Sequence, residues 1–494
     1  MEKRVCFINP PSPFLLDERV FPSLGLLMVA TLVKTIGHYL VSVLDLSGVV
    51  NYGEAVEDFL RTEHPYAVGI TVTTPQLPAV VAIVDIIRQK APETRIILGG
   101  PHITLVHSAF SREQQAKNET GRASTAFDQL YKLADVLISG DGEKAILLAM
   151  GPDPPKVINA DDPKSHLFSS NEDLGNLPLV DRSLIEMGSY HYMIDGVPAT
   201  SLITQLGCPF GCGFCGGRNS PTFRRMRSRP IASILSEMEY LYLAFGIRGF
   251  MLFDDELNVN GLHMMELMTA VIKLQERLGV EFRLRGFIKS QLFNQEQARL
   301  MHQAGFRWVL SGFESGSPKI LNNMNKKATV GQNTACVELA KRNGLKVKAL
   351  MSLGHPGESA GTALTTKNWL IDIEPDDFDV TVITPYPGTP YYDEAVPHPL
   401  LHDVWVYTRN GDNLYSRNVD YGKVANFYKG NPDGGYESYV FTDHLGPEGI
   451  VALRNEVEQD VRKKLNIPYP SSAEAVRYEH SMGQSGLPGH ILRQ

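Results

Sequence analysis

Cysteine is scarce in this chain of 494 residues, which contains five, and three of them fall within residues 208–215. An odd number of cysteines, with Cys6 and Cys336 each far from the others, does not suit the paired framework of a small secreted protein. Long apolar runs are also missing, since none approaches the roughly 20 residues that a membrane-spanning helix requires. The sequence enters a strand pattern almost at its first residue, so it shows no secretory signal. We therefore expect a cytoplasmic protein without a transmembrane segment.

Positive charge is sparse as well. The chain has 47 Lys and Arg against 55 Asp and Glu, a formal net charge of −8, and no long basic tract. Nucleic-acid-binding surfaces concentrate positive charge, so the composition argues against such a partner and favours a small molecule. The content of 43% hydrophobic and 21% charged residues is that of an ordinary globular protein, long enough for two or three domains.

Strand and helix patterns alternate through residues 1–145. Short apolar runs, typical of strands buried on both faces, are separated by stretches of helical spacing. This alternation predicts a first domain of α/β class, with a doubly wound, Rossmann-like parallel sheet of the flavodoxin type. The expected strands are residues 5–9, 41–46, 67–72, 95–98 and 134–139, and the expected helices include residues 24–37, 55–62 and 78–90.

Small and polar residues follow three of these strands. They are Thr73-Thr74-Pro75-Gln76, Gly99-Gly100-Pro101-His102 and Gly140-Asp141-Gly142-Glu143. Ligands of doubly wound sheets bind past the carboxyl ends of the strands. The sequence therefore predicts a binding crevice that these three segments line.

A second strand–helix series occupies residues 200–395. Its expected strands are residues 201–205, 249–253, 281–286, 308–311, 346–351 and 378–384. Six such units in this length predict a partial (β/α)6 barrel, with functional groups at the carboxyl ends of the strands. Residues 146–199, rich in Pro, Asp, Asn and Ser, are predicted to be a linker. Residues 396–494 form a small tyrosine-rich C-terminal region with one helical stretch at 447–465, which we expect either to cover the substrate or to pack as ordinary core.

The three clustered cysteines, Cys208-x₃-Cys212-x₂-Cys215, directly follow the first strand of this second series. Several glycines among them let the backbone wrap closely around a bulky group. Three thiolates suit three irons of a [4Fe–4S] cluster and leave the fourth iron open for another ligand. A structural zinc is one alternative, but it needs a fourth ligand, and no histidine occurs between His191 and His263. Three buried cysteines without any metal are the other alternative.

The cysteine spacing, with Phe214 before the last cysteine, resembles the radical S-adenosylmethionine superfamily. Over residues 5–395 the chain resembles the subgroup in which a cobalamin (B12)-binding domain precedes the radical barrel. The segments that carry this resemblance are residues 21–27, 69–76, 98–102 and 139–143 in the first domain, and residues 253–258, 312–317, 354–358 and 385–390 in the barrel.

The resemblance implies three cofactors. The first is a [4Fe–4S] cluster held by Cys208, Cys212 and Cys215; the second is S-adenosylmethionine, bound at the open iron; and the third is cobalamin. For S-adenosylmethionine it implies contacts from Asp254, Asp255, Glu256, Arg285, Glu314 and Gly354, and for cobalamin from Thr73, Thr74, Gln76, Gly99, Gly100, Gly140 and Glu143. Carboxylates suit the amino group of S-adenosylmethionine, and Arg285 or Lys289 suits its carboxylate.

Each of these contacts has a structural alternative. The acidic run at 254–256 also fits a helix cap, Arg285 and Lys289 fit surface ion pairs, and the segment at Gly354 fits a simple turn. The pattern D-x-H-x-x-G, which supplies a histidine to cobalt, is absent, so the lower face of the cobalt is open, water-bound or covered by a side chain from residues 71–76. A domain with this fold and no bound B12 is a further alternative.

The resemblance also implies a reaction. Reductive cleavage of S-adenosylmethionine gives a 5′-deoxyadenosyl radical, which removes hydrogen from an unactivated carbon, and methylcobalamin then donates a methyl group. We therefore expect a C-methyltransferase for a small molecule or natural-product intermediate, reduced by a donor such as a ferredoxin or flavodoxin. The alternatives are a B12-dependent radical cyclase, oxidase or rearrangement enzyme, and a non-catalytic metal-binding sensor or structural protein. A methylthiotransferase is disfavoured because only two scattered cysteines remain for its additional cluster.

Overall fold

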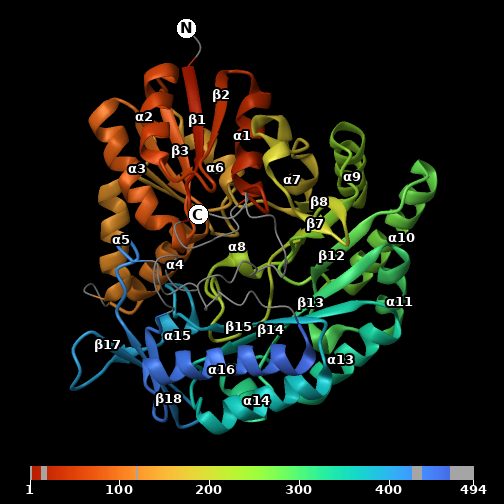
Figure 1. The fold of residues 1–494 in the computed structure, drawn as a ribbon. Coiled ribbons are helices and arrows are strands. Elements are labelled where there is room, and N and C mark those ends of the chain that lie inside the picture. Colours follow the sequence, from red (N-terminus) through yellow and green to blue (C-terminus); the bar gives the residue numbers. More distant parts are fainter. Residues whose placement is uncertain (1–2, 13–18, 118–120, 425–436, 468–494) are drawn as a thin grey trace.

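Two parallel β-sheets organise the chain, and the computed structural model describes residues 3–12, 19–117, 121–424 and 437–467 (Figure 1). The first sheet has the strand order β2-β1-β3-β4-β5-β6, and its neighbouring strands run parallel. This order reverses at β1, as in flavodoxin-type sheets. The strands are β1 (Lys3–Asn9), β2 (Tyr39–Asp45), β3 (Ala67–Thr71), β4 (Arg95–Gly99), β5 (Val136–Gly140) and β6 (Val157–Ala160).

Alternating side chains of the first sheet pack against helices on both of its faces. Val5 and Phe7 belong to one apolar cluster, with α1 (Leu24–Ile36) and α6 (Gly142–Ala149). Cys6 and Ile8 belong to the cluster on the opposite face. The helices of that face are α2 (Tyr52–Glu63), α3 (Leu77–Lys90), α4 (Pro101–Gln115) and α5 (Arg122–Leu133). The predicted doubly wound fold is therefore confirmed.

The second sheet curls into a half-barrel of order β15-β14-β13-β12-β11-β8-β7. Six of its strands are parallel: β8 (Val197–Leu202), β11 (Gly249–Leu252), β12 (Arg283–Phe287), β13 (Phe306–Glu314), β14 (Lys346–Leu353) and β15 (Asp377–Val382). The seventh, β7 (Met193–Ile194), pairs antiparallel with β8. The predicted partial barrel is confirmed.

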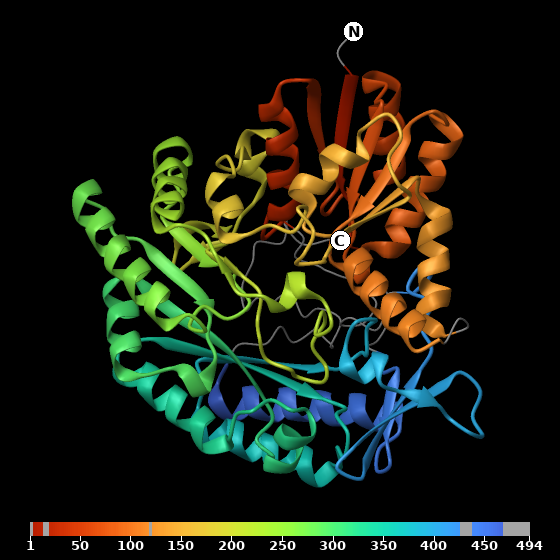
Figure 2. The same ribbon diagram turned by 180° about the vertical axis from the view of Figure 1, so that it is seen from behind.

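Helices cover the outer face of this half-barrel, as Figure 2 shows from behind. Their apolar faces and the outer side chains of the strands form the largest core cluster of the described chain. The helices are α9 (Ile231–Phe245), α10 (Gly261–Leu278), α11 (Gln295–Gln303), α12 (Pro318–Asn323), α13 (Val330–Arg342), α14 (Ala360–Ile373) and α16 (Pro447–Leu465). Within the residues that the structure describes, no helix is both long and apolar enough to cross a membrane.

The segment predicted as a linker contributes more structure than its composition indicates. It contains β6, which extends the first sheet, a short helix α7 (Asn171–Asn176) and the strand β7 of the second sheet. β6 has four residues between Pro155 and Asp161, too short a run to stand out from its polar surroundings. The domain boundaries at residues 145, 199 and 395 stay predictions.

The C-terminal region forms a small antiparallel sheet below α4 and α5 (Figure 1). Its order is β16 (Val396–Pro397), β17 (Val404–Arg409), β18 (Asp412–Arg417) and β19 (Val440–Thr442). Of its tyrosines, Tyr407 packs on Tyr391 of the barrel. Tyr421 is buried against the domain of the first sheet, which we call the first lobe or B12 lobe below. These two side chains are therefore part of the hydrophobic core. Tyr428 and Tyr436 lie outside the described residues.

Candidate active site

The cysteine loop, residues 207–220, connects β9 (Gln205–Leu206) to α8 (Pro221–Arg224) and lies between the two lobes in both ribbon views (Figures 1 and 2). Gly207 opens the loop with a φ of +87°, a conformation that disfavours side chains, and a Cβ there would lie 2.1 Å from the carbonyl oxygen of Arg225. The loop therefore turns back onto the segment that follows it.

Arg218 holds this loop together from within. Its side chain is 5% exposed, and Nη1 donates to the carbonyl oxygens of Cys208 at 2.8 Å and Phe210 at 2.7 Å. Nε and Nη2 both donate to the carbonyl oxygen of Gly216 at 3.1 Å. One guanidinium thus satisfies three carbonyl groups of a loop that has little regular structure of its own.

The three thiols occupy one environment and none is part of a disulfide. Burial raises the pKa of Cys215 to about 12, and the neighbouring thiols of Cys212 and Cys208 act in the same direction. Across the described residues, no three His, Cys, Asp or Glu side chains are preassembled as a metal site. Three thiols carried by one loop suit a cluster that is bound through three of its irons.

The acidic run after β11 separates into two roles. Asp254 is buried and accepts hydrogen bonds from the backbone N–H of Thr204 at 2.7 Å, from the Thr204 hydroxyl and from the N–H of Gln205 at 3.2 Å. Asp255 accepts from the N–H of Gly207 at 3.0 Å. Both carboxylates therefore support the strand that leads into the cysteine loop.

Glu256 has a different orientation. Its carboxylate lies near the ammonium groups of Lys326 and Lys289 and the carboxylate of Glu314, while burial raises its pKa. Lys289 and Lys326 are both close to the Cys212 thiol as well. Glu256 is thus the member of the acidic run that lies near both Lys289 and Lys326.

Lys289, which follows β12, is the cation beside the cysteine loop, rather than Arg285 within β12. Its ammonium lies 4.3 Å from the ring centroid of Phe210, and Asn258 exchanges two hydrogen bonds with its backbone, at 2.8 and 3.1 Å. The guanidinium of Arg285 lies 5.2 Å from the ring centroid of Trp308 and bonds to Tyr192. The contact of Arg285 with S-adenosylmethionine stays a prediction.

Glu314 begins a buried polar chain. Its Oε1 accepts from Lys326 at 3.1 Å and its Oε2 from the Ser352 hydroxyl at 2.7 Å. The Ser352 hydroxyl contacts Nε2 of His355 at 2.8 Å, and Nδ1 of His355 contacts the Tyr391 hydroxyl at 3.1 Å.

The backbone of Glu314 is held in an uncommon conformation. It has a φ of +66°, and the pairing of β13 with β14 shifts register between Gly312 and Glu314. Such strain in a non-glycine residue is concentrated at functional sites. Glu314 is therefore a well-positioned carboxylate at the mouth of the half-barrel, where the sequence placed it.

The turn at Gly354 is built by its own segment. Gly354 has a φ of +95°, and the Glu358 carboxylate accepts from the backbone of Gly354 and His355. Burial lowers the pKa of His355 to about 3, so its ring is neutral at physiological pH. The turn interpretation is correct for the backbone, and contact of Gly354 with S-adenosylmethionine stays a prediction.

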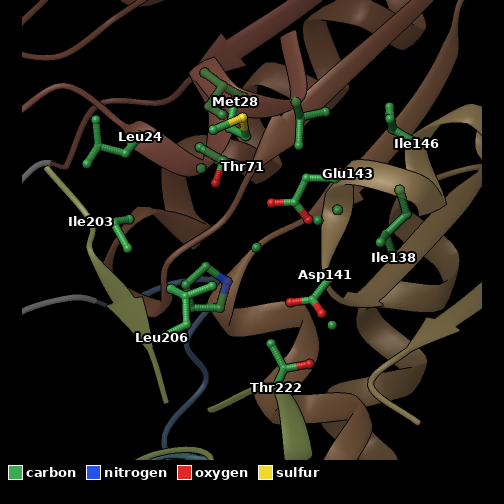
Figure 3. A pocket seen from close by; sticks show the side chains of 18 of the residues that line it. Leu24, Met28, Thr71, Ile138, Asp141, Glu143, Ile146, Ile203, Leu206 and Thr222 are labelled. Atoms are coloured by element: carbon green, nitrogen blue, oxygen red, sulfur yellow. The ribbon is translucent and has the colours of Figure 1, made fainter. Parts of the chain in front are cut away.

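A cavity of about 340 Å³ lies at the carboxyl ends of the strands of the first sheet (Figure 3). Its walls come from α1, from the ends of β3, β4 and β5, and from α6, and most of its lining is apolar. Leu206 and Gly207 of the barrel complete it, together with Asp255. The residue next to Cys208 therefore also borders the cavity of the first lobe.

Four of the seven residues predicted to contact cobalamin line this cavity: Gly99, Gly100, Gly140 and Glu143. Gly140 has a φ of +93°, and a Cβ there would lie 2.4 Å from the backbone of Asp161. The others bond within their own lobe, since Thr73 and Gln76 form a capping box and Thr74 contacts Nδ1 of His102 at 3.0 Å. An apolar cavity at the switch point of a doubly wound sheet fits the insertion of an organic cofactor.

Two carboxylates of the first lobe bond to the segment that follows the cysteine loop. Asp141 pairs with Arg227 at 2.5 Å, with both side chains buried. Asp161 accepts from the Ser220 hydroxyl at 2.7 Å and from the N–H of Thr222 at 2.8 Å. The candidate cobalamin site and the cysteine loop are thus parts of one bonded assembly.

Sequence reasoning missed several of these groups. Arg218 and Lys326 lie in loops where no periodicity points to them, Ser352 is a single polar residue among apolar ones, and Tyr391 is one of two adjacent tyrosines that nothing in the sequence distinguishes. Only the position of Arg218, directly after Gly216 and Gly217 of the cysteine loop, could have indicated from the sequence that it contacts this loop.

Comparison with known proteins agrees with these two lobes. The radical SAM superfamily model matches residues 202–370, and the B12 binding domain model matches residues 18–131. An uncharacterized methyltransferase of Pyrococcus horikoshii is 27% identical over 403 residues, covering 81% of this chain and 84% of that protein. An anaerobic magnesium-protoporphyrin IX monomethyl ester cyclase of Rubrivivax gelatinosus is 25% identical over 351 residues, covering 69% of this chain and 60% of that protein.

A solved structure has a similar fold over most of the chain. The radical S-adenosylmethionine methyltransferase TsrM from Kitasatospora setae, with cobalamin and a [4Fe–4S] cluster bound, aligns with a TM-score of 0.64 at 19% identity, covering 83% of this chain and 82% of that one. At 19% identity the structural similarity to TsrM supports only the fold. The assignment to a family rests on the matches to the radical SAM and B12 binding domain models. The chain therefore belongs to the radical S-adenosylmethionine enzymes that carry an N-terminal B12-binding domain, and its cofactors are a [4Fe–4S] cluster, S-adenosylmethionine and cobalamin.

Proposed function

We propose that this enzyme transfers a methyl group to a carbon atom of a small molecule or natural-product intermediate. One observation carries the proposal: Gly207 and Asp255, which adjoin the cysteine loop and the S-adenosylmethionine side of the barrel, also line the cavity of the B12 lobe. A methyl acceptor must reach both cofactors, so a transferase of this kind needs their two sites to share a boundary. The name of the Pyrococcus horikoshii relative supports a methyltransferase.

The chain's own residues have separate tasks in this proposal. Bound cofactors supply an electron from the cluster, a 5′-deoxyadenosyl radical from S-adenosylmethionine and a methyl group carried by cobalamin. Cys208, Cys212 and Cys215 hold the cluster, and Arg218 keeps their loop closed. Glu256 accepts the amino group of S-adenosylmethionine, and Lys289 pairs with its carboxylate, since these are the carboxylate and the ammonium that flank the cysteine loop.

Glu314 is proposed to bind the nucleoside part of S-adenosylmethionine. Its two oxygens are fixed by Lys326 and Ser352, so it offers a preorganised acceptor for ribose hydroxyls. A ferredoxin or flavodoxin is the proposed source of the electron.

The test uses the holoenzyme, reconstituted anaerobically with iron, sulfide and cobalamin. It is incubated with S-adenosylmethionine carrying a labelled methyl group and with the small-molecule fraction of cells. The proposal expects S-adenosylhomocysteine and 5′-deoxyadenosine together, with label in a new product. A variant with Cys208, Cys212 and Cys215 all changed to Ala is the control and forms no 5′-deoxyadenosine.

The second candidate function is radical cyclisation, oxidation or rearrangement with cobalamin as an electron carrier. The named activity of the Rubrivivax gelatinosus relative favours it. It predicts 5′-deoxyadenosine without S-adenosylhomocysteine and without label in any product. That result refutes methyl transfer.

A further inference from the structure

Glu143 places a carboxyl group inside an otherwise apolar cavity. It belongs to the first turn of α6, and Figure 3 shows its side chain in the cavity with Met28, Ile138 and Ile146 around it. The Oε2 atom is buried and has no hydrogen-bond partner among the described residues. A buried polar atom without a partner is costly, so it indicates a ligand that supplies one.

Burial favours the neutral form of Glu143, and the neighbouring cations are engaged with other partners. Asp141, the adjacent carboxylate, is already paired with Arg227, and Arg227 also donates to the carbonyl oxygens of Ser169 and Thr222. The other cation, Lys144, pairs with Asp173 at 2.7 Å. Burial and the charge of Asp141 together raise the pKa of Glu143 to about 7, against the opposing effect of its own backbone N–H and these two cations.

In its protonated form the carboxyl group of Glu143 donates a hydrogen bond, so an occupant that presents an acceptor satisfies the unpartnered Oε2 atom. Most of the lining is apolar, and its two arginines are already paired, Arg227 with Asp141 and Arg229 with Glu237, so a flat, neutral, largely apolar group fits it better than a phosphate. Cobalamin has one group of this description: the dimethylbenzimidazole base of its nucleotide tail, whose ring nitrogen is an acceptor once it leaves the cobalt. The corrin ring with its amide side chains is too large for about 340 Å³.

We propose that Glu143 is a specificity residue for the lower base of the cofactor, and that its carboxyl group donates a hydrogen bond from Oε2 to the ring nitrogen of the benzimidazole. The inference rests on the same cobalamin-dependent function and adds a preference among cobamides. A cofactor whose lower base lacks an acceptor nitrogen, such as a phenolic cobamide, loses this contact. Cobinamide, which keeps the corrin and its amides but has no nucleotide, loses it as well.

The experiment compares the wild-type protein with the E143Q and E143L variants. Affinities for cobalamin, phenolic cobamide and cobinamide are measured by fluorescence quenching. The Gln side chain keeps a neutral donor of the same length, whereas Leu keeps the volume without a donor. Loss of one hydrogen bond to a buried group corresponds to about five- to tenfold in affinity.

The expected result is that E143L binds cobalamin about five- to tenfold more weakly than the wild type, while E143Q stays within about twofold. Both variants bind cobinamide and phenolic cobamide as the wild type does. Three results would overturn the proposal: equal losses for cobalamin and cobinamide in E143L, an unchanged cobalamin affinity in E143L, and a loss in E143Q as large as that in E143L, which shows that the carboxyl group acts as an anion.

Two further readouts do not depend on activity. The electron paramagnetic resonance spectrum of bound cob(II)alamin should lack nitrogen splitting from the base, and its presence contradicts placement of the base in the cavity. E143L apoprotein should unfold at a temperature no lower than the wild type, because it removes an unpartnered polar atom, and only its cobalamin-induced thermal shift should shrink. Failure of methyl transfer alone, with these binding results intact, counts against the proposed function and not against the role of Glu143.

Discussion

Arg122 connects the B12 lobe to the C-terminal part of the barrel. Its replacement by methionine measures how much these contacts contribute to the free energy of unfolding. It is 6% exposed, and its guanidinium carbon lies 3.6 Å from the ring centroid of Tyr392 and 4.5 Å from that of Trp405. Nη2 donates to the carbonyl oxygen of Tyr392 at 2.5 Å, and Nη1 donates to the Ser416 hydroxyl at 3.4 Å. Through Arg122, α5 of the first lobe is thus bonded to residues 390–393 at the C-terminal end of the barrel and to β18 of the C-terminal sheet.

The magnitude follows from these contacts. A desolvated cation–π contact is worth about 2 kcal/mol, and a hydrogen bond from a charged donor about 1.5–3 kcal/mol. Methionine regains part of this sum, because it fills the space and avoids the cost of burying a charge, which lowers the pKa of Arg122. We expect R122M to reduce the free energy of unfolding by about 2–3 kcal/mol in urea denaturation of the apoprotein.

The control is R112M at the same interface. Arg112 pairs with Glu394 at 3.7 Å, and the two side chains are 42% and 44% exposed, so its loss should cost less than about 1 kcal/mol. In the holoenzyme, R122M should also raise the ratio of 5′-deoxyadenosine to S-adenosylhomocysteine. The reason is that the cobalamin site and the S-adenosylmethionine site are no longer fixed in position relative to each other. Equal destabilisation by R122M and R112M, or an unchanged product ratio, would refute this reasoning.

Three further predictions concern single groups of the barrel. D254N should lower the iron content per chain, because Asp254 supports the strand before the cysteine loop. E256Q should keep its iron and bind S-adenosylmethionine about tenfold more weakly in calorimetry. Equal iron loss in the two variants would contradict the separate roles of Asp254 and Glu256. R218M should lose iron, since three loop carbonyls lose their donor, while R225M, which replaces an exposed arginine just after the loop, should retain it. Burial raises the pKa of Glu358 to about 7, above the 4.5 of the unfolded chain, so the stability that its protonated form contributes below pH 4.5 is lost as the pH rises through 7. The stability of E358Q relative to wild type should therefore increase by about 3 kcal/mol between pH 4.5 and pH 8 in urea titrations, and parallel pH profiles would contradict this.

Much of the fold was predictable because buried parallel strands leave a strong pattern. Every strand expected in the two sheets is present, with ends that differ by a few residues. The C-terminal sheet was not predicted, although Asn410-Gly411 between the alternating residues of β17 and β18 is a hairpin signal, and both residues have positive φ. Strands as short as β6 and β16 leave no such pattern, and only their partners in the sheet define them.

The candidate site was predictable as a set of strand ends and not as a set of contacts. Asp254, Asp255 and Glu256 are adjacent in sequence, and nothing in their composition says that two of them support the backbone while the third faces Lys289 and Lys326. That division depends on how the chain turns after β11, which long-range packing decides. Lys326 reaches the site because α12 ends beside β13, a relation that no local pattern encodes.

The glycine-rich cysteine loop explains why the two lobes depend on each other. Glycines give it the curvature to surround a cluster, and they also leave it with few side chains that could stabilise it. Arg218 supplies part of the missing order from within. The rest comes from the B12 lobe, where Asp141 and Asp161 bond to residues 220–227 and Leu105 packs on Gly216. A barrel without the first lobe would lose the ion pair between Arg227 and Asp141 and the hydrogen bonds to Asp161. The B12 lobe is therefore structural support for the cluster loop as well as the carrier of the second cofactor.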